Sequence, residues 1–340
     1  MKKFNVGIIG CGRIGKVHAE SITYHIPNAV VKSVSDVRLD GVKEWADSLG
    51  IQNVYSDHKE ILNDPEIDAV LVCSSTDTHS VISTEAANAG KHIFCEKPID
   101  YDLGRIQSTL DAVAKAGVKF QVGFNRRFDH NFAKINKVTK DGVIGEPHVI
   151  KITSRDPEPP PVEYVKVSGG IFLDMTIHDF DMARFQAGSE VEEVYAVGNC
   201  LVNPAIAEAG DVDTAVITLK FENGAIGVID NSRRAAYGYD QRVEVFGSKG
   251  AVEAKNDTET TCSVSTEEGV VSEKPLYFFL ERYMGSFVEE MKQFFAAIEN
   301  DTDTAVQGID GLKPVLIGLA AKKSIEEGRP VKISEIEALM

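Results

Sequence analysis

The chain has 340 residues, 43% of them hydrophobic and 26% charged, which is enough for two domains with sizeable cores. Its formal net charge of −16 argues against a nucleic-acid partner, because binding phosphates requires a cationic surface. The cysteines form no CxxC pair, which disfavours a disulfide framework and a structural zinc site.

The N-terminal apolar run is too short for a signal peptide, and no stretch approaches the ~20 apolar residues that span a bilayer. We therefore expect a cytoplasmic protein without a membrane partner, and we expect no metal.

The first part of the chain alternates short β-branched runs with longer helical patterns. Strands are predicted at 5–10, 29–36, 67–75, 92–96 and 119–124, and helices from residue 13 and at 41–50, 78–90 and 103–117. The nearly continuous apolar run at 67–75 is typical of a strand covered on both faces. This alternation predicts an α/β domain over residues 1–124, with a doubly wound parallel sheet of the Rossmann type.

From residue 125 to residue 340 the pattern changes. A proline-rich loop at 155–164 precedes alternating runs at 192–202, 213–235 and 241–255, of which the second contains an Asn223–Gly224 hairpin signal. Helices are predicted at 278–300 and 308–328, the latter interrupted at Pro314. These features predict an α+β domain with a large, mostly antiparallel sheet.

Residues 10–15, GCGRIG, form a G-x-G-x-x-G motif that follows a strand and opens a helix. Gly10 permits the tight turn, Gly12 allows the backbone to approach a pyrophosphate, and Gly15 allows close packing of helix on strand. The helix N-terminus presents N–H groups to the phosphates. The motif therefore predicts a dinucleotide site.

Asp36 ends the second predicted strand, at the expected distance for a carboxylate that binds the adenosine ribose. A carboxylate accepts hydrogen bonds from the 2′-hydroxyl and repels a 2′-phosphate, so the sequence favours NAD over NADP. Arg38 lies two residues further on and is the type of side chain that could receive that phosphate.

The segment LDMTIHDFD, residues 173–181, places Asp174 and His178 four residues apart, on one face if the segment is helical. A structural interpretation and a catalytic one, in which the carboxylate orients a titratable imidazole, are equally supported by this spacing. A metal site is disfavoured because no second histidine stands at ligand spacing. Lys97 follows an apolar strand and precedes Pro98. Both a surface role and a functional role remain open for this lysine.

Several motifs occur together and in a fixed order: the glycine loop, CEKP at 95–98, GFNRRFD at 123–129, IGEP at 144–147, the D-x-x-x-H of Asp174 and His178, and YGYD at 237–240. With them the chain resembles the Gfo/Idh/MocA oxidoreductases over most of its length. Within that family it is most similar to the inositol 2-dehydrogenases.

The resemblance implies an NAD-binding domain followed by an open-faced domain for substrate binding and oligomerisation, with the 308–328 helix packed back on the first domain. It implies NAD-dependent oxidation of a cyclic polyol, myo-inositol or scyllo-inositol, to the 2-keto compound, as part of inositol catabolism. A homotetramer is expected, and the Lys97–Pro98 peptide is expected to be cis. An aldose or other sugar dehydrogenase, and an NAD(H)-binding regulator without turnover, remain alternatives.

In this hypothesis His178 is the general base, Asp174 orients it, and Lys97 stabilises the developing alkoxide. The candidate cofactor contacts are Gly10, Gly12, Arg13, Ile14, Gly15, Asp36, Arg38, Ser74, Ser75, Thr76, His79, Glu96 and Lys97. The candidate substrate contacts are Lys97, Asn125, Arg126, Asp156, Asp174, His178 and Tyr239.

Overall fold

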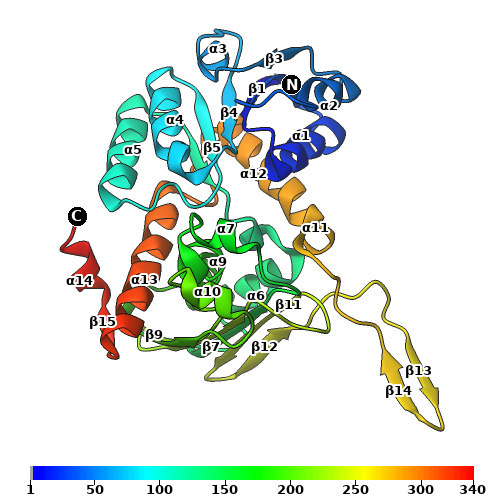
Figure 1. The fold of residues 1–340 in the computed structure, drawn as a ribbon, viewed down its shortest axis with the longest axis vertical. Helices are drawn as coiled ribbons and strands as arrows, with labels where there is room; N and C mark the ends of the chain where they lie inside the picture. The colour runs from blue at the N-terminus through cyan, green and yellow to red at the C-terminus, as the bar shows by residue number, and fades with distance from the viewer. Residues whose placement is uncertain (1–2) are drawn as a thin grey trace. The chain divides into compact units, whose positions relative to one another are not determined.

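The computed structural model describes residues 3–340, which form two compact units (Figure 1). The first unit contains the described residues up to Phe128 together with Gly285–Val315. The second contains Asp129–Met284 and Leu316–Met340. Residues 285–315, which the sequence-based limits assign to the second domain, thus lie in the first unit.

The first unit is built on a six-stranded parallel sheet. Its strand order is β3 (Asn53–Tyr55), β2 (Ala29–Ser35), β1 (Phe4–Ile9), β4 (Ala69–Val72), β5 (His92–Cys95) and β6 (Phe120–Val122). All four side chains of β4 are buried, as expected for a strand covered on both faces. The predicted doubly wound sheet is confirmed.

Helices flank this sheet, and α4 and α5 lie side by side (Figure 1). The helices of the first unit are α1 (Arg13–His25), α2 (Val42–Ser48), α3 (Lys59–Leu62), α4 (Thr76–Asn88), α5 (Leu103–Ala116), the 3-10 helix Asn125–Phe128, most of α12 (Met284–Asn300) and the start of α13 (Gly308–Glu327). Met291, Phe294 and Phe295 of α12 belong to the core beneath β1. This packing explains why α12 belongs to the first unit.

The helix α13 continues through Pro314, so the predicted interruption at that residue is wrong. Proline removes one helical hydrogen bond and crowds the preceding turn. The fully buried side chains of Val315, Leu316 and Ile317 show that packing outweighs this local cost. At the start of the helix, Gly311 lies directly against Ile99.

The second unit contains a seven-stranded mixed sheet. Its strand order is β12 (Gly250–Ala254), β11 (Asp240–Gly247), β7 (Pro147–Arg155), β10 (Ile226–Ser232), β9 (Thr214–Phe221), β8 (Val191–Asn199) and β15 (Val331–Lys332). β7 and β10 are parallel, and the other pairs are antiparallel. The predicted β9–β10 hairpin is confirmed, whereas the interior strand β7 has no counterpart in the sequence-based prediction.

Side chains along β9 alternate between buried and exposed, so one face of this sheet is covered and the other is open. The helices of the second unit are α6 (His130–Lys140), α7 (Val162–Val165), α8 (Gly170–Asp174), α9 (Ile177–Ala187), α10 (Pro204–Glu208), α11 (Phe279–Arg282) and α14 (Ile333–Glu337). A separate exposed hairpin, β13 (Ser263–Thr266) with β14 (Gly269–Ser272), projects from this unit (Figure 1). Within residues 3–340, no helix combines the length and apolar character that a membrane span needs.

Candidate functional site

The glycine loop lies between β1 and α1, and its backbone is closely packed except at Gly12. A Cβ on Gly10 would lie 2.5 Å from the carbonyl of Cys73, and one on Gly15 would lie 2.0 Å from the Gly10 oxygen. At Gly12 no atom of residues 3–340 lies within 4 Å of the corresponding position. No side chain in the described part of the sequence caps the N-terminus of α1. The loop therefore has both the open space and the available N–H groups that a pyrophosphate needs.

Asp36 lies directly after β2 and is bonded to this loop. Its Oδ2 accepts a hydrogen bond from the Cys11 N–H at 2.8 Å, and its Oδ1 accepts one from the Arg38 N–H at 2.9 Å. Each oxygen keeps a further lone pair for a ribose hydroxyl. Burial and the Asp36 charge raise the pKa of Cys11 to about 12, so this thiol stays protonated beside the loop.

The second predicted cofactor segment follows β4, the strand next to β1. The Ser74 hydroxyl lies 2.7 Å from that of Thr78, and Ser75 precedes α4, which begins at Thr76. The buried His79 has its two ring nitrogens 2.8 Å from the Pro98 oxygen and 3.0 Å from the Ser74 oxygen. This histidine links the loop after β4 to the segment after β5.

That segment carries Glu96 and Lys97 at the carboxyl end of β5. Glu96 Oε1 lies 2.7 Å from Nε2 of the fully buried His18. Lys97 is half-buried, and the Lys97–Pro98 peptide is cis, as expected. Within the first unit the three segments thus follow neighbouring strands of one parallel sheet, where open α/β sheets bind ligands.

Asn125 and Arg126 lie on the 3-10 helix after β6, and both are buried. The Asn125 amide donates to the Ser286 hydroxyl at 3.3 Å. Burial shows that both residues contribute to packing, and their predicted substrate contacts remain a prediction.

In the second unit, Asp174 ends α8 and His178 lies in the first turn of α9. Every other side chain from 171 to 184 is buried, whereas these two are half-buried and reach the surface. Titratable side chains that reach the surface together from an otherwise buried segment are candidates for a functional site. The predicted orientation of His178 by Asp174 remains a prediction.

The sheet holds this segment through Asn231 of β10. The Thr176 hydroxyl donates to Asn231 Oδ1 at 2.6 Å, and Asn231 Nδ2 donates to Asp179 Oδ2 at 2.9 Å. All three side chains are fully buried. Asp179, adjacent to His178, therefore anchors α9 to the sheet.

Two residues that the sequence-based prediction missed contact Asp174. The Tyr164 hydroxyl donates to Asp174 Oδ1 at 2.9 Å, and Arg233 Nη1 lies 3.1 Å from Asp174 Oδ2. Arg233 also lies 3.6 Å from Asp156, so the structure brings two predicted substrate residues to one cation. Tyr239 is buried, and its ring meets the edge of Tyr283.

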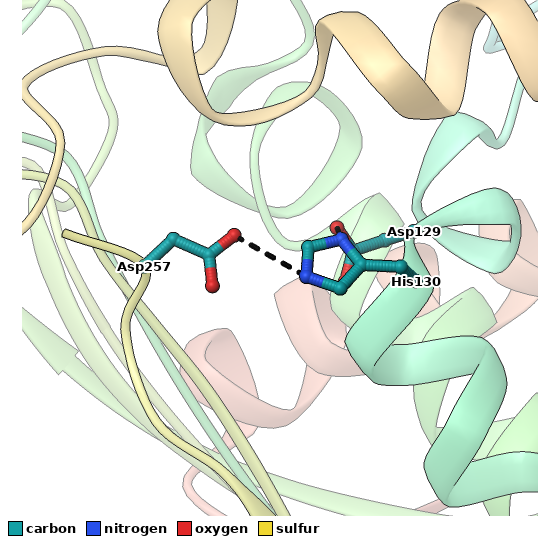
Figure 2. Close-up of side chains that lie close together, drawn as sticks. All are labelled: Asp129, His130 and Asp257. Atoms are coloured by element: carbon teal, nitrogen blue, oxygen red, sulfur yellow. Dashed lines mark ion pairs between the residues drawn. The ribbon is translucent and has the colours of Figure 1, made fainter. Parts of the chain in front are cut away.

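Asp129, His130 and Asp257 form a cluster of ligand-type side chains in the second unit, with the His130 ring 3.8 Å from Asp257 (Figure 2). The buried guanidinium of Arg282 bonds the carboxylate of Asp129 and lies 3.0 Å from that of Asp257. A protein cation therefore already balances both carboxylates, and the cluster gives no reason to propose a metal.

Two family models match the chain. One, described as an oxidoreductase family with an NAD-binding Rossmann fold, matches residues 4–124, and the GFO/IDH/MocA C-terminal domain matches residues 132–253. The myo-inositol 2-dehydrogenase of Thermotoga maritima is 54% identical over 97% of this chain and 99% of its own. The inositol 2-dehydrogenase of Rhizobium meliloti is 45% identical over 96% of this chain and 98% of its own.

Among solved structures, the fold matches a scyllo-inositol dehydrogenase from Lactobacillus casei with bound NAD(H) and scyllo-inositol. The TM-score is 0.92 at 32% sequence identity, covering 98% of this chain and all of that one. The fold and the glycine-loop site, together with these matches, define an NAD-dependent oxidoreductase. The chain belongs to the Gfo/Idh/MocA family, as its motifs indicated.

Proposed function

We propose that the chain oxidises a secondary alcohol of a cyclic polyol, myo-inositol or scyllo-inositol, to the 2-keto compound. The observation that carries the proposal is the joint emergence of Asp174 and His178 from an otherwise buried segment. The inositol dehydrogenases that are 54% and 45% identical over nearly the whole chain support the substrate class.

Oxidising an alcohol requires removal of a proton from oxygen and of a hydride from carbon. Bound NAD supplies the hydride acceptor. We assign the proton to His178 as general base, with the Asp174 carboxylate stabilising the imidazolium that forms. The ammonium of Lys97 stabilises the developing alkoxide.

A ring with many hydroxyls needs several polar contacts besides the reacting one. We assign these to Asn125, Arg126, Asp156 and Tyr239. The carboxylate of Asp156 accepts from hydroxyls, whereas Asn125 and Arg126 donate to them.

The test is an assay of NADH formation with NAD and a panel of myo-inositol, scyllo-inositol, glucose and xylose. Turnover with one or both inositols and little with the sugars is the expected result. Preference for glucose or xylose would instead identify a sugar dehydrogenase. NAD binding without turnover of any member would favour a regulator.

We further propose that the protein is a cytoplasmic homotetramer that acts in inositol catabolism. The open face of the second unit's sheet supports an interface, because it exposes Val197, Val216 and Phe246. Light scattering on the purified chain tests the subunit number, and a monomer would exclude the tetramer.

A further inference from the structure

Arg233 is a buried cation that contacts two carboxylates of the proposed substrate site. It follows β10 directly, its backbone N–H donates to the Asp213 oxygen at 2.8 Å, and its side chain is 3% exposed. Its Nη1 lies 3.1 Å from Asp174 Oδ2 and 3.6 Å from Asp156 Oδ2. One guanidinium nitrogen therefore faces both acids.

The other guanidinium nitrogens do not reach solvent. Nε and Nη2 are buried, and neither has a hydrogen-bond partner among the described residues. A ligand at the surface cannot touch these atoms without rearrangement. The remaining nitrogen, Nη1, faces the two acids, so Arg233 is placed to act on a substrate through them.

Asp174 is held at both of its oxygens by different parts of the second unit. Oδ1 accepts from the Tyr164 hydroxyl of α7, and Oδ2 pairs with Arg233 at the end of β10. A carboxylate fixed at both oxygens has little rotational freedom. Asp211 also acts electrostatically on Arg233, so the guanidinium lies among three acids.

The charge of Arg233 persists in spite of its burial. Burial lowers its pKa, but the nearby charges of Asp174 and Asp156 outweigh that effect and raise the pKa overall. A permanent cation at this position attracts both carboxylates electrostatically.

We propose that Arg233 is a positioning residue that fixes the orientation of the Asp174 and Asp156 carboxylates and balances their charge for catalysis. The proposal rests on the proposed function, in which Asp174 acts with the base His178 and Asp156 contacts the substrate. Because both acids contact one nitrogen, their carboxylates lie close together, which suits neighbouring hydroxyls on a polyol ring.

The experiment compares Arg233→Gln and Arg233→Lys with wild type, and Arg234→Gln is the matched control. Arg234 is the next residue and is exposed, so its variant removes the same charge without touching either acid. The measurements are kcat and KM for the polyol that wild type oxidises, NADH affinity by fluorescence, thermal unfolding, and the pH profile of kcat/KM.

For Arg233→Gln we expect kcat/KM to fall by about 10²-fold, the loss typical of misplaced catalytic groups. NADH affinity should not change. The acid limb of the pH profile, which reports the general base, should move to higher pH because removal of the cation leaves more negative charge around that base. Arg233→Lys should lose less activity than Arg233→Gln, and its acid limb should stay at the wild-type pH. Arg234→Gln should match wild type in every measurement.

A wild-type kcat/KM and an unmoved acid limb in a folded Arg233→Gln protein would overturn the proposal. A loss of activity no larger than the loss of folded protein, again with an unmoved limb, would also overturn it, because it would indicate a structural role alone. Should Arg233→Gln fail to fold, Arg233→Lys decides: wild-type kcat/KM contradicts the proposal, because the shorter lysine side chain does not place its ammonium at the Nη1 position that contacts both carboxylates.

The positioning role of Arg233 can be tested even if the proposed function fails. If wild type oxidises no member of the panel, the proposed substrate is wrong, and a crystal structure of Arg233→Gln, or of Arg233→Lys should the former not fold, then tests the positioning role. A displacement of the Asp174 carboxylate by about 1 Å or more supports it, since shifts of that size disable catalytic groups. An unmoved carboxylate overturns it.

Discussion

His18 is fully buried with its Nε2 2.7 Å from Oε1 of Glu96, the residue immediately before Lys97. Glu290 of α12 is fully buried in the same unit, and neither of its carboxylate oxygens has a hydrogen-bond partner among the described residues. Burial, together with the charge of Glu96, raises the pKa of Glu290 well above its ordinary value. The folded chain therefore stabilises the protonated form of Glu290.

This burial predicts a pH-dependent stability that Glu290→Gln should remove. A raised pKa stabilises the fold fully below the unfolded value of about 4.3, and the contribution falls as the pH rises towards the folded value. The amide of the variant cannot ionise. As the pH rises, the free energy of unfolding of Glu290→Gln should therefore increase relative to that of wild type, by up to about 1.4 kcal/mol per pH unit. Urea unfolding between about pH 5 and about pH 8 measures the difference.

Glu289→Gln is the control for this experiment, since Glu289 lies on the same helix and is 44% exposed. Its stability relative to wild type should be nearly independent of pH. A constant difference between Glu290→Gln and wild type across the range would show that Glu290 ionises normally in the folded protein.

Replacement of His178 by alanine should lower kcat by about 10²–10⁴-fold, the usual contribution of a general base. NADH affinity should remain at the wild-type level, because the glycine loop and Asp36 belong to the first unit. Single-turnover kinetics and NADH fluorescence provide the two measurements. His130→Ala is the control, as this ring is 72% exposed, and wild-type turnover by His178→Ala would exclude the base assignment.

Asp36→Ser should reduce the preference for NAD over NADP, because the carboxylate that repels a 2′-phosphate is removed. The ratio of kcat/KM for the two cofactors should change by about tenfold or more, which corresponds to about 1.4 kcal/mol. Aspartate accepts the Cys11 and Arg38 N–H groups with two different oxygens, whereas serine has a single side-chain oxygen. The loop should therefore become less rigid in the variant. A wild-type enzyme that prefers NADP would show that Arg38, and not Asp36, decides the cofactor preference.

The first unit was predictable because the sequence patterns that indicate its elements and its cofactor site are local. The glycines of residues 10–15, the apolar strands and the acid at Asp36 each follow from a short stretch of sequence, and the structure places them along neighbouring strands. Pro314 shows the limit of local rules, since burial of the following residues keeps the helix intact.

The partners of Asp174 could not be predicted in the same way. Tyr164 comes from a proline-rich segment and Arg233 from the end of a strand, and only the tertiary fold brings them to one carboxylate. Asn231 is similar, because an asparagine in an alternating strand carries no sign that it anchors a helix. Side-chain pairing between distant segments depends on strand order, which local periodicity does not encode.

Asp211 and Asp213 lie two residues apart and should respond to pH in opposite ways. Three backbone N–H groups, those of Leu201, Val202 and Asn203, each donate to Asp213 at 2.8 Å and lower its pKa, although burial acts in the other direction. Burial dominates at Asp211 and raises its pKa, although its carboxylate accepts backbone N–H groups from Val212 and, at 2.9 Å, from Ile171.

Asp213→Asn should therefore destabilise the protein at neutral pH, by an amount on the order of 3 kcal/mol for the loss of hydrogen bonds to a charged group. A lowered pKa stabilises the fold above the unfolded value of about 3.9, and this contribution disappears as the pH falls through the folded value. The deficit of the variant should thus shrink in acid. Asp211→Asn should behave oppositely and gain stability relative to wild type as the pH rises, because its amide oxygen still accepts the Ile171 N–H. Urea unfolding of both variants between about pH 2 and about pH 8 distinguishes them, and parallel pH profiles would refute the assignment.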